Sequence, residues 1–303
     1  MNLTLHFLPC SYDGEMRYGK SAPAKKAAGT VLLLPGWGEW IEKYKEVISS
    51  WNERGYNVVI AEWRGQGLSS RFLMDRKKTW LPSFDLLVED LERLFKTELG
   101  NEKKIILLCH SMGAHIGLRW FLERGRKYPS IKAVILVSML HRLKTAPIPS
   151  IIALWIIKFA AWLGFDQAYA IGQKDFDQAK GTFESNPLTQ SEAHYQNLMA
   201  HLTEKPELKV GGLTYGWLYA FLQSAKRLEQ DLARGAPRIP YLVMGSQEDP
   251  LVETSGFTFV ASMLPNCKVQ YLHGAKHELL QEKEEFRLQT WEWMDQFLTR
   301  LKA

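Results

Sequence analysis

The chain of 303 residues has the composition of a globular protein, with 46% hydrophobic and 23% charged residues, which excludes wholesale disorder and permits a sizeable buried core. The formal net charge of +5 comes from basic residues spread along the chain, so nucleic-acid binding is not indicated, while contact with an anionic surface stays open. The three cysteines are far apart and lack metal-ligand spacing, which predicts reduced thiols and no metal site.

Short apolar runs recur along the chain, and each is followed by a glycine-containing turn and a helical pattern. Most of these runs lack polar/apolar alternation, which is typical of strands buried on both faces of a parallel sheet. The predicted strands are 30–34, 56–61, 104–109, 133–138, 241–244 and 269–272. The predicted helices of this pattern are 40–53, 83–98, 111–124, 252–263 and 282–301. This order predicts an α/β protein with a mostly parallel central sheet flanked by helices.

The alternation of strand and helix stops over residues 141–237. Helical patterns over 151–165 and 214–232 replace it, without the intervening strands. We therefore expect one α/β core formed by residues 1–140 and 238–303, with a helical cap inserted between its two parts.

The predicted cap helices carry several large aromatic residues. Trp155, Phe159 and Trp162 lie at positions i, i+4 and i+7, so they share one helical face. We expect this face to form the core of the cap, and contact with lipid or with an acyl chain is the alternative. Trp217, on the second cap helix, is a further candidate to line a substrate site.

Two features of the sequence bear on where the protein lies in the cell. The first residues hold no cationic leader followed by a long apolar stretch, so no signal peptide is expected. The most apolar segment, 151–165, is interrupted by Lys158 and falls short of the roughly 20 apolar residues that a membrane-spanning helix needs. The expected location is cytoplasmic, and peripheral contact with the inner face of an anionic membrane stays open.

The strongest candidate for a nucleophile lies where a buried strand runs into a helix through a tight turn. In the segment Cys109-His110-Ser111-Met112-Gly113, Ser111 stands at the apex of that turn. A nucleophile elbow of this kind strains the backbone of the serine and needs small residues two positions before and after it. Gly113 satisfies the second place, and Cys109 replaces the usual first glycine. A serine that only caps the helix is the alternative.

A serine hydroxyl becomes a nucleophile when a histidine takes its proton and a carboxylate orients the histidine. Asp249 follows a predicted strand at the end of a glycine turn, and His277 lies in the loop after the last predicted strand. Glu248 is the rival for the acid, and His273 is the rival for the base. We prefer Asp249 and His277 because the order serine, acid, histidine is that of the α/β-hydrolase fold.

Acyl transfer also requires N–H groups that stabilise the developing oxyanion. One usually belongs to the residue after the nucleophile, here Met112. The other usually comes from the loop after an early strand, and Trp37, in the glycine-rich segment Pro35-Gly36-Trp37-Gly38, is the expected donor. Taken alone, such a segment is more often only a turn.

Taken in order, these segments resemble the monoacylglycerol lipase and bacterial lysophospholipase L2 group of α/β-hydrolases over nearly the whole chain. Residues 35–39 are similar to the group's His-Gly-x-x-Glu oxyanion segment, with Pro35 in place of the histidine, and the group's basic-Tyr pair follows as Lys43 and Tyr44. A later loop that begins at Glu62 is similar to the group's Asp-x-x-Gly-x-Gly-x-Ser loop, with glutamate in place of the aspartate.

The resemblance implies an α/β-hydrolase with a helical cap after the sixth strand, which would cover the site and provide an apolar tunnel for an acyl chain. It implies cleavage of a carboxylic ester, most readily in a lysophospholipid or a monoacylglycerol, through an acyl-enzyme on Ser111 and without a metal or organic cofactor. Acyl transfer and the cleavage of small esters are alternatives on the same triad. An alternative of another class is a hydrolase-fold protein that binds ligands without turnover. The sequence predicts no particular oligomeric state.

Overall fold

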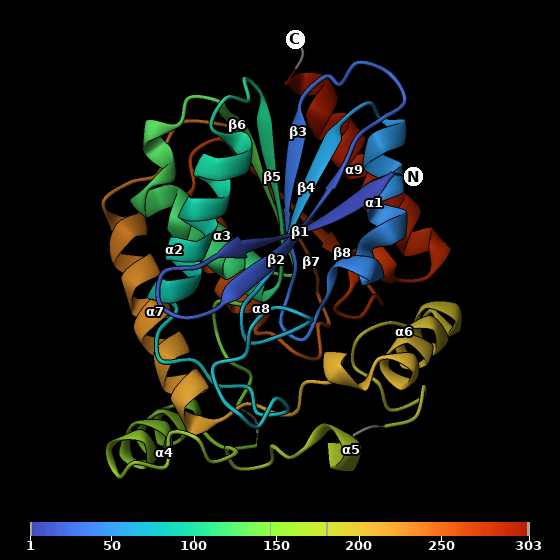
Figure 1. The fold of residues 1–303 in the computed structure, drawn as a ribbon. Helices are drawn as coiled ribbons and strands as arrows, with labels where there is room; N and C mark the ends of the chain where they lie inside the picture. The colour runs from blue at the N-terminus through green and yellow to red at the C-terminus, as the bar shows by residue number, and fades with distance from the viewer. Residues whose placement is uncertain (1, 146, 180, 302–303) are drawn as a thin grey trace.

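The computed structural model describes residues 2–145, 147–179 and 181–301, and its centre is an eight-stranded sheet of order β1-β2-β4-β3-β5-β6-β7-β8 (Figure 1). Neighbouring strands from β4 to β8 in this order run parallel, whereas β2 is antiparallel to both β1 and β4. The strands are β1 (Leu3–Pro9), β2 (Glu15–Ser21), β3 (Thr30–Leu34), β4 (Asn57–Glu62), β5 (Ile105–His110), β6 (Ile131–Val137), β7 (Tyr241–Ser246) and β8 (Cys267–Leu272). The mostly parallel sheet expected from the sequence is confirmed.

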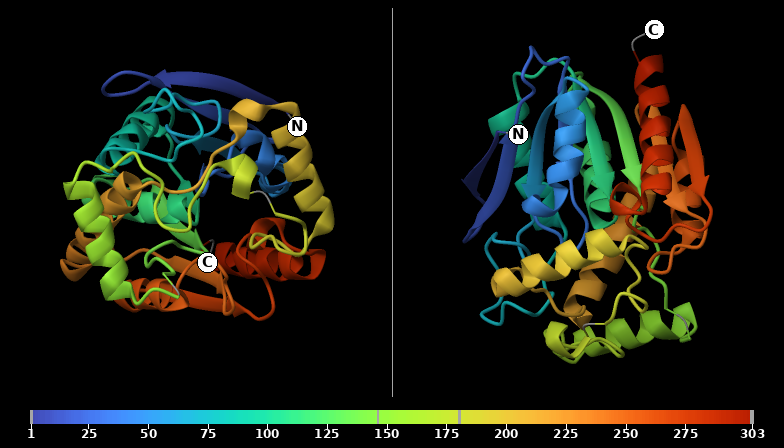
Figure 2. Two further views of the ribbon diagram at one scale, coloured as in Figure 1. Left: turned by 90° about the horizontal axis from the view of Figure 1, so that it is seen from below. Right: turned by 90° about the vertical axis from the view of Figure 1, so that its right-hand side faces the viewer.

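Helices cover both faces of the sheet (Figure 2). The long helices of the core are α1 (Lys45–Glu53), α2 (Asp85–Leu94), α3 (Met112–Glu123), α8 (Thr254–Met263) and α9 (Glu284–Arg300). Short helical turns are η1 (Ile41–Tyr44), η2 (Phe95–Leu99), η3 (Gly125–Lys127), η4 (Pro206–Leu208) and η5 (Leu279–Gln281). α1 and α9 pack on one face, and α2, α3 and α8 pack on the other.

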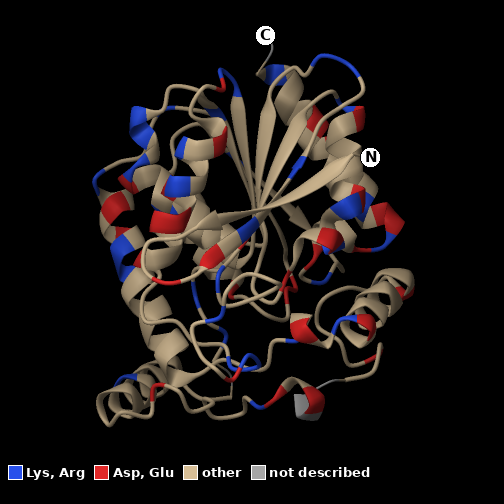
Figure 3. Ribbon diagram, in the orientation of Figure 1, with Lys and Arg blue, Asp and Glu red and all other residues tan. Residues whose placement is uncertain are grey.

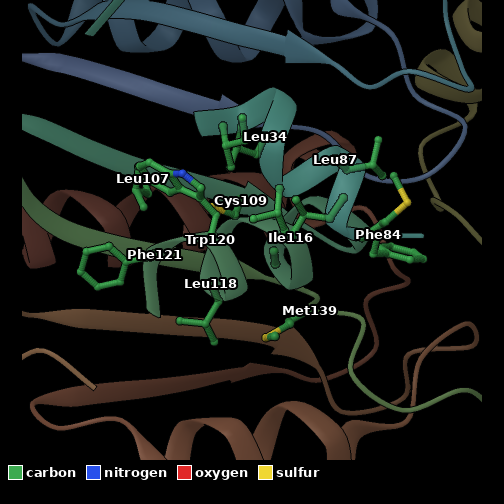
Figure 4. Close-up of a cluster of buried hydrophobic side chains, with 14 of the residues drawn as sticks. Leu34, Phe84, Leu87, Leu107, Cys109, Ile116, Leu118, Trp120, Phe121 and Met139 are labelled. Atoms are coloured by element: carbon green, nitrogen blue, oxygen red, sulfur yellow. The ribbon is translucent and has the colours of Figure 1, made fainter. Parts of the chain in front are cut away.

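Alternate residues of the central strands supply the two cores. On β3, Leu32 and Leu34 join the cluster under α2 and α3, while Val31 and Leu33 join the cluster under α1 and α9. Figure 4 shows the first cluster, in which Leu34 lies among side chains of β5, α2 and α3. Because both faces are covered, every residue of β3 and of β5 is buried, which explains their continuous apolar sequences.

The hairpin of β1 and β2 was not among the predicted elements. β1 is one of the two edge strands, and most of its residues are exposed. An exposed edge strand needs no apolar run, so its sequence lacks the signal that marked the central strands. β2 is better buried, and its Arg17 forms ion pairs with Glu42 and Glu62 that hold the hairpin to the sheet.

Residues of the expected cap pass over the carboxyl ends of the parallel strands (Figures 1 and 2). Their helices are α4 (Ser150–Trp162), α5 (Phe176–Ala179), α6 (Glu192–Glu204) and α7 (Tyr215–Ala233). α7 packs against both α4 and α3. Its buried side chains belong to the same cluster as those of α2 and α3, so this helix connects α4 to the core.

The expectation that the aromatic face of α4 forms the core of the cap is wrong. Trp155, Phe159 and Trp162 are 69%, 59% and 78% exposed, and the buried residues of α4 are Ala153 and Ile157. The helix is apolar on nearly every side, so periodicity alone could not show which side faces inward. In Figure 3, α4 is almost free of charge, whereas charged residues are common on the core helices. No helix of the described residues is both long and apolar enough to cross a bilayer.

Candidate active site

Ser111 occupies a strained turn between β5, which ends at His110, and α3, which begins at Met112. Its φ of 51° and ψ of −117° lie in a region that residues with a Cβ rarely adopt. Glycine is required two positions later, because a Cβ on Gly113 would lie 2.2 Å from the carbonyl oxygen of Leu34. The elbow thus brings the start of α3 against the end of β3.

Cys109, which stands where a glycine is usual in such a turn, is accommodated by a glycine on α3. A Cβ on Gly117 would lie 2.8 Å from the Cys109 Sγ and 2.7 Å from the Leu34 Cδ1. The space that the thiol occupies is therefore the space left by the missing side chain of Gly117. Cys109 is fully buried.

The three residues predicted as a triad lie in contact. The His277 Nε2 is 2.9 Å from the Ser111 Oγ, and the His277 Nδ1 is 2.7 Å from the Asp249 Oδ2. All three side chains are buried. These are the distances and the order of contacts that serine activation requires. Their catalytic roles stay a prediction.

The loops after β7 and β8 hold the acid and the histidine in place. The Asp249 Oδ1 accepts hydrogen bonds from the backbone N–H groups of Leu251 and Val252, which leaves Oδ2 to face His277. Burial would raise the pKa of Asp249, but the charge of His277 and these hydrogen bonds outweigh burial and lower the pKa. At the end of β6, the Ser138 Oγ donates to the His277 carbonyl at 2.7 Å, which anchors the histidine loop.

The rival acid and base lie on the surface. Glu248 and His273 are exposed, and the His273 Nδ1 lies 3.4 Å from the Glu248 Oε1. Glu248 also accepts a hydrogen bond from the backbone N–H of Gly274. These contacts brace the loop beside the triad and give the pair a structural role.

Gln66 fixes the backbone of the expected oxyanion loop. Its side-chain amide donates to the carbonyl oxygens of Gly36 and Glu39 at 2.8 and 3.2 Å, and its Oε1 accepts from the Gly38 N–H at 3.0 Å. The Gly36 N–H donates to the carboxylate of Glu39. The peptide groups on both sides of Trp37 are therefore held in place. Gln66 was not predicted as a site residue, since nothing in its local sequence marks this contact.

The two expected oxyanion donors have no protein acceptor. Among the described residues, the backbone N–H groups of Trp37 and Met112 make no hydrogen bond, although their neighbours do. Met112 is the first residue of α3, where the N–H has no acceptor within the helix, and Trp37 lies in an exposed part of its loop. The residues before them, Gly36 and Ser111, lie close together, since a Cβ on Gly36 would be 3.1 Å from the Ser111 Cβ. The role of the two N–H groups as oxyanion donors stays a prediction.

A buried network of charged groups lies behind these loops. Glu39 accepts a hydrogen bond from the Tyr44 hydroxyl at 2.5 Å and lies 3.0 Å from the His110 Nδ1. The Lys43 Nζ bridges Glu39 at 2.7 Å and Glu278 at 2.5 Å. Burial would raise the pKa of Glu39, but Lys43 and His110 outweigh burial and hold the pKa well below its usual range. The network joins the oxyanion loop, the elbow and the histidine loop. The sequence indicated its members only through the family resemblance, since they share no pattern of their own.

The candidate substrate-lining residues differ in burial, and their role stays a prediction. Trp217 is buried in the core, stacked on Phe221 at 5.7 Å between ring centroids and in edge contact with Phe84 at 5.3 Å. The three aromatic residues of α4 point outward, as described above. Over the described ranges, no cluster of three or more His, Cys, Asp or Glu side chains is suited to hold a metal ion.

The order of the strands, the serine turn after β5 and the sequence of serine, acid and histidine define the class as an α/β-hydrolase. A soluble variant of the monoglyceride lipase of Saccharomyces cerevisiae superposes with a TM-score of 0.77 at 18% identity, covering 99% of this chain and 97% of that chain. A carboxyl esterase of Bacillus coagulans also gives a TM-score of 0.77, at 17% identity and 100% coverage of both chains. The expected fold is confirmed.

The chain belongs to the hydrolase family described as serine aminopeptidase, S33, whose model matches residues 25–284. It is 26% identical to the probable lysophospholipase L2 of Haemophilus influenzae over 278 residues, which cover 91% of this chain and 85% of that protein. It is 29% identical to the lysophospholipase L2 of Escherichia coli over 269 residues, 85% of this chain and 76% of that protein. The expected class of enzyme, a serine ester hydrolase, is confirmed.

Proposed function

We propose that this enzyme hydrolyses the carboxylic ester of a monoacyl lipid, either a lysophospholipid or a monoacylglycerol, through an acyl-enzyme on Ser111. The observation that carries the proposal is the position of His277, which lies 2.9 Å from the Ser111 hydroxyl and 2.7 Å from the Asp249 carboxylate. The similarity to lysophospholipases L2 and to a monoglyceride lipase supports the choice of substrate.

In the proposed reaction, the His277 Nε2 takes the hydroxyl proton of Ser111 as the Oγ attacks the ester carbonyl. The N–H groups of Trp37 and Met112 donate to the carbonyl oxygen as it becomes an oxyanion. His277 then gives its proton to the leaving alcohol, which is the head-group side of the lipid. Water, deprotonated by His277, attacks the acyl-enzyme; the bond to the Ser111 Oγ then breaks, His277 returns the proton to that oxygen, and the fatty acid leaves. Asp249 stays ionised and stabilises the imidazolium in both steps.

A panel of substrates tests this function. The purified enzyme would receive lysophospholipids, monoacylglycerols, p-nitrophenyl esters of increasing chain length and an aminoacyl arylamide, with products identified by mass spectrometry. We expect free fatty acid from the monoacyl lipids and a loss in Ser111→Ala on the order of 10⁶-fold. A preference for short esters, or transfer of the acyl group to an added alcohol, would favour the alternative reactions. A Ser111 that a fluorophosphonate does not label would favour a binding protein without turnover.

We further propose that α4 places the enzyme on a lipid surface. Seven large apolar side chains on and just after this helix are more than a third exposed: Ile151, Ile152, Trp155, Phe159, Trp162, Leu163 and Phe165. A group of exposed large apolar side chains on one helix is a feature of surfaces that bind lipid or protein, and tryptophan and phenylalanine are suited to the interface of a bilayer. Lys158, within the helix, and the net charge of +5 favour an anionic bilayer. The cytoplasmic location stays a prediction.

Co-sedimentation with vesicles tests the docking of α4. We expect the enzyme to bind vesicles that contain phosphatidylglycerol, and we expect the variant Trp155→Ser/Trp162→Ser to bind them at least tenfold more weakly. Leu288→Ser is the matched control, because Leu288 is 61% exposed on α9 and lies outside the α4 surface. Equal binding by the double variant and the wild type would contradict the docking of α4 and leave the triad chemistry untouched.

A further inference from the structure

Thr79 contacts the side chain of the expected oxyanion donor. The indole Nε1 of Trp37 donates to the Thr79 Oγ1 at 3.1 Å. Thr79 is 4% exposed and lies in the long connection between β4 and α2, far from the triad in sequence. The Trp37 side chain is 37% exposed, and this hydrogen bond fixes the polar end of its indole.

Thr79 is itself fixed by the segment that leads into α7. Its Oγ1 donates to the Gly211 carbonyl at 2.8 Å. Its carbonyl accepts from the Thr214 N–H at 3.2 Å and from the Thr214 Oγ1 at 2.7 Å. Thr214 in turn caps α7, since its Oγ1 accepts from the Trp217 N–H. A hydroxyl has one proton, and that of Thr79 is directed to Gly211, so a lone pair is available for Trp37.

A second contact joins the same loop to the cap. Trp40 follows the oxyanion loop and is 1% exposed, in a cluster with Leu202 of α6 and Leu208 of η4. The cap therefore contacts the loop directly by apolar packing at Trp40, and indirectly at Trp37 through Thr79, which bonds to Gly211 and Thr214. The remaining restraints on the loop, through Gln66 and Glu39, come from the core.

We propose that Thr79 is a positioning residue that sets the direction of the Trp37 backbone N–H, and so makes the oxyanion site depend on the docked cap. This inference rests on the proposed function. Gln66 holds the carbonyl of the peptide group that carries the Trp37 N–H and also the N–H of Gly38, and Thr79 holds the Trp37 indole, so these contacts together limit the rotation of Trp37. Since donors aimed in advance at the oxyanion stabilise the transition state and not the bound ester, Thr79 affects kcat and leaves KM nearly unchanged.

A double-mutant cycle on a soluble medium-chain p-nitrophenyl ester tests this role. Thr79→Val removes the hydroxyl, and Trp37→Phe removes the indole N–H but keeps the backbone donor. We expect each variant to lower kcat about tenfold, within the loss known for a whole oxyanion donor, with KM changed less than twofold. The double variant should be no slower than the slower single variant, because both remove the same contact. Thr79→Ser keeps the hydroxyl and should retain wild-type kcat.

Two controls separate positioning from simple destabilisation. Thr290→Val removes a hydroxyl that donates to a backbone carbonyl of α9 at 2.7 Å in an equally buried site, so it should leave kcat unchanged. An alkyl trifluoromethyl ketone forms a tetrahedral adduct with the serine, and its Ki should rise in Thr79→Val by the same factor as kcat/KM falls.

Three results would overturn the inference: an unchanged kcat in Thr79→Val, losses that multiply in the double variant, or an unchanged Ki for the ketone. If Thr79→Val does not fold, Trp37→Phe decides, because a wild-type kcat in that variant contradicts the role of the contact. A wild type without ester turnover would instead contradict the proposed function, and the inference with it.

Discussion

The substitution Gly113→Ala tests the packing that brings the serine turn against the oxyanion loop. A Cβ at this position would lie 2.2 Å from the Leu34 carbonyl oxygen and 2.3 Å from the Pro35 carbonyl oxygen. Both neighbours are backbone atoms, and the Pro35 carbonyl is also held by the Trp63 indole at 2.8 Å. The methyl group therefore has no flexible side chain to displace.

The expected cost follows from two opposing effects. Overpacking in a core costs about 1–3 kcal/mol, and rigid neighbours place this site near the upper end. The smaller conformational freedom of alanine in the unfolded chain offsets about 0.4–1 kcal/mol. We expect a net loss of about 2 kcal/mol in the free energy of unfolding. Relief of the clash must also move Pro35 or Met112, and displacement of catalytic groups by about 1 Å can lower turnover on the order of 100-fold.

Urea unfolding followed by tryptophan fluorescence, together with kcat on a p-nitrophenyl ester, measures both effects. Gly235→Ala is the control, because a Cβ at Gly235 would meet nothing within 4 Å. Its φ of +91° costs the control about 1 kcal/mol of strain without any effect on turnover. A Gly113→Ala enzyme as stable and as active as the wild type would refute the packing argument.

Two further predictions concern the charged groups of the site. Asp249→Asn should lower kcat by about 10⁴-fold while Glu248→Gln keeps wild-type turnover, as measured on the same ester; equal losses would reverse the assignment of the acid. Burial would lower the pKa of His110, but Glu39 outweighs burial and raises the pKa. The His110–Glu39 pair therefore stabilises the fold fully below the pKa of an unfolded histidine, about 6.5. This stabilisation is lost as pH rises through the higher pKa of the folded state. The stability of the wild type, measured by urea unfolding, should thus fall more steeply from pH 6 to pH 8.5 than that of Glu39→Gln, and parallel slopes would contradict the coupling.

Burial on both faces made the central strands predictable from the sequence. β3 has the predicted bounds of residues 30–34, because covered strands leave a continuous apolar run with clear ends. α6 was not predicted, since it is amphipathic only weakly and buries one residue, Leu202. The inward face of α4 could not be predicted either, because a helix that is apolar all round carries no directional signal.

The same reasoning separates the site residues that could be predicted from those that could not. Ser111, Asp249 and His277 each follow a strand, and parallel strands bring their carboxyl ends to one edge of a sheet. Lys43 and Glu278 form an ion pair across 235 positions of the sequence, and buried charges have no periodic pattern that would reveal such a pair. Contacts of this kind, including those of Gln66 and Thr79, depend on tertiary packing.

The central claim is that Ser111 carries the acyl group between two half-reactions. Rapid acid quenching of the enzyme with a palmitoyl lysophospholipid, followed by peptide mass spectrometry, tests it most directly. We predict a palmitoyl group on the peptide that contains Ser111, formed in the wild type and lost in both Ser111→Ala and His277→Ala. Fatty acid release with no acyl group on Ser111, or with the acyl group on another residue, would contradict the claim.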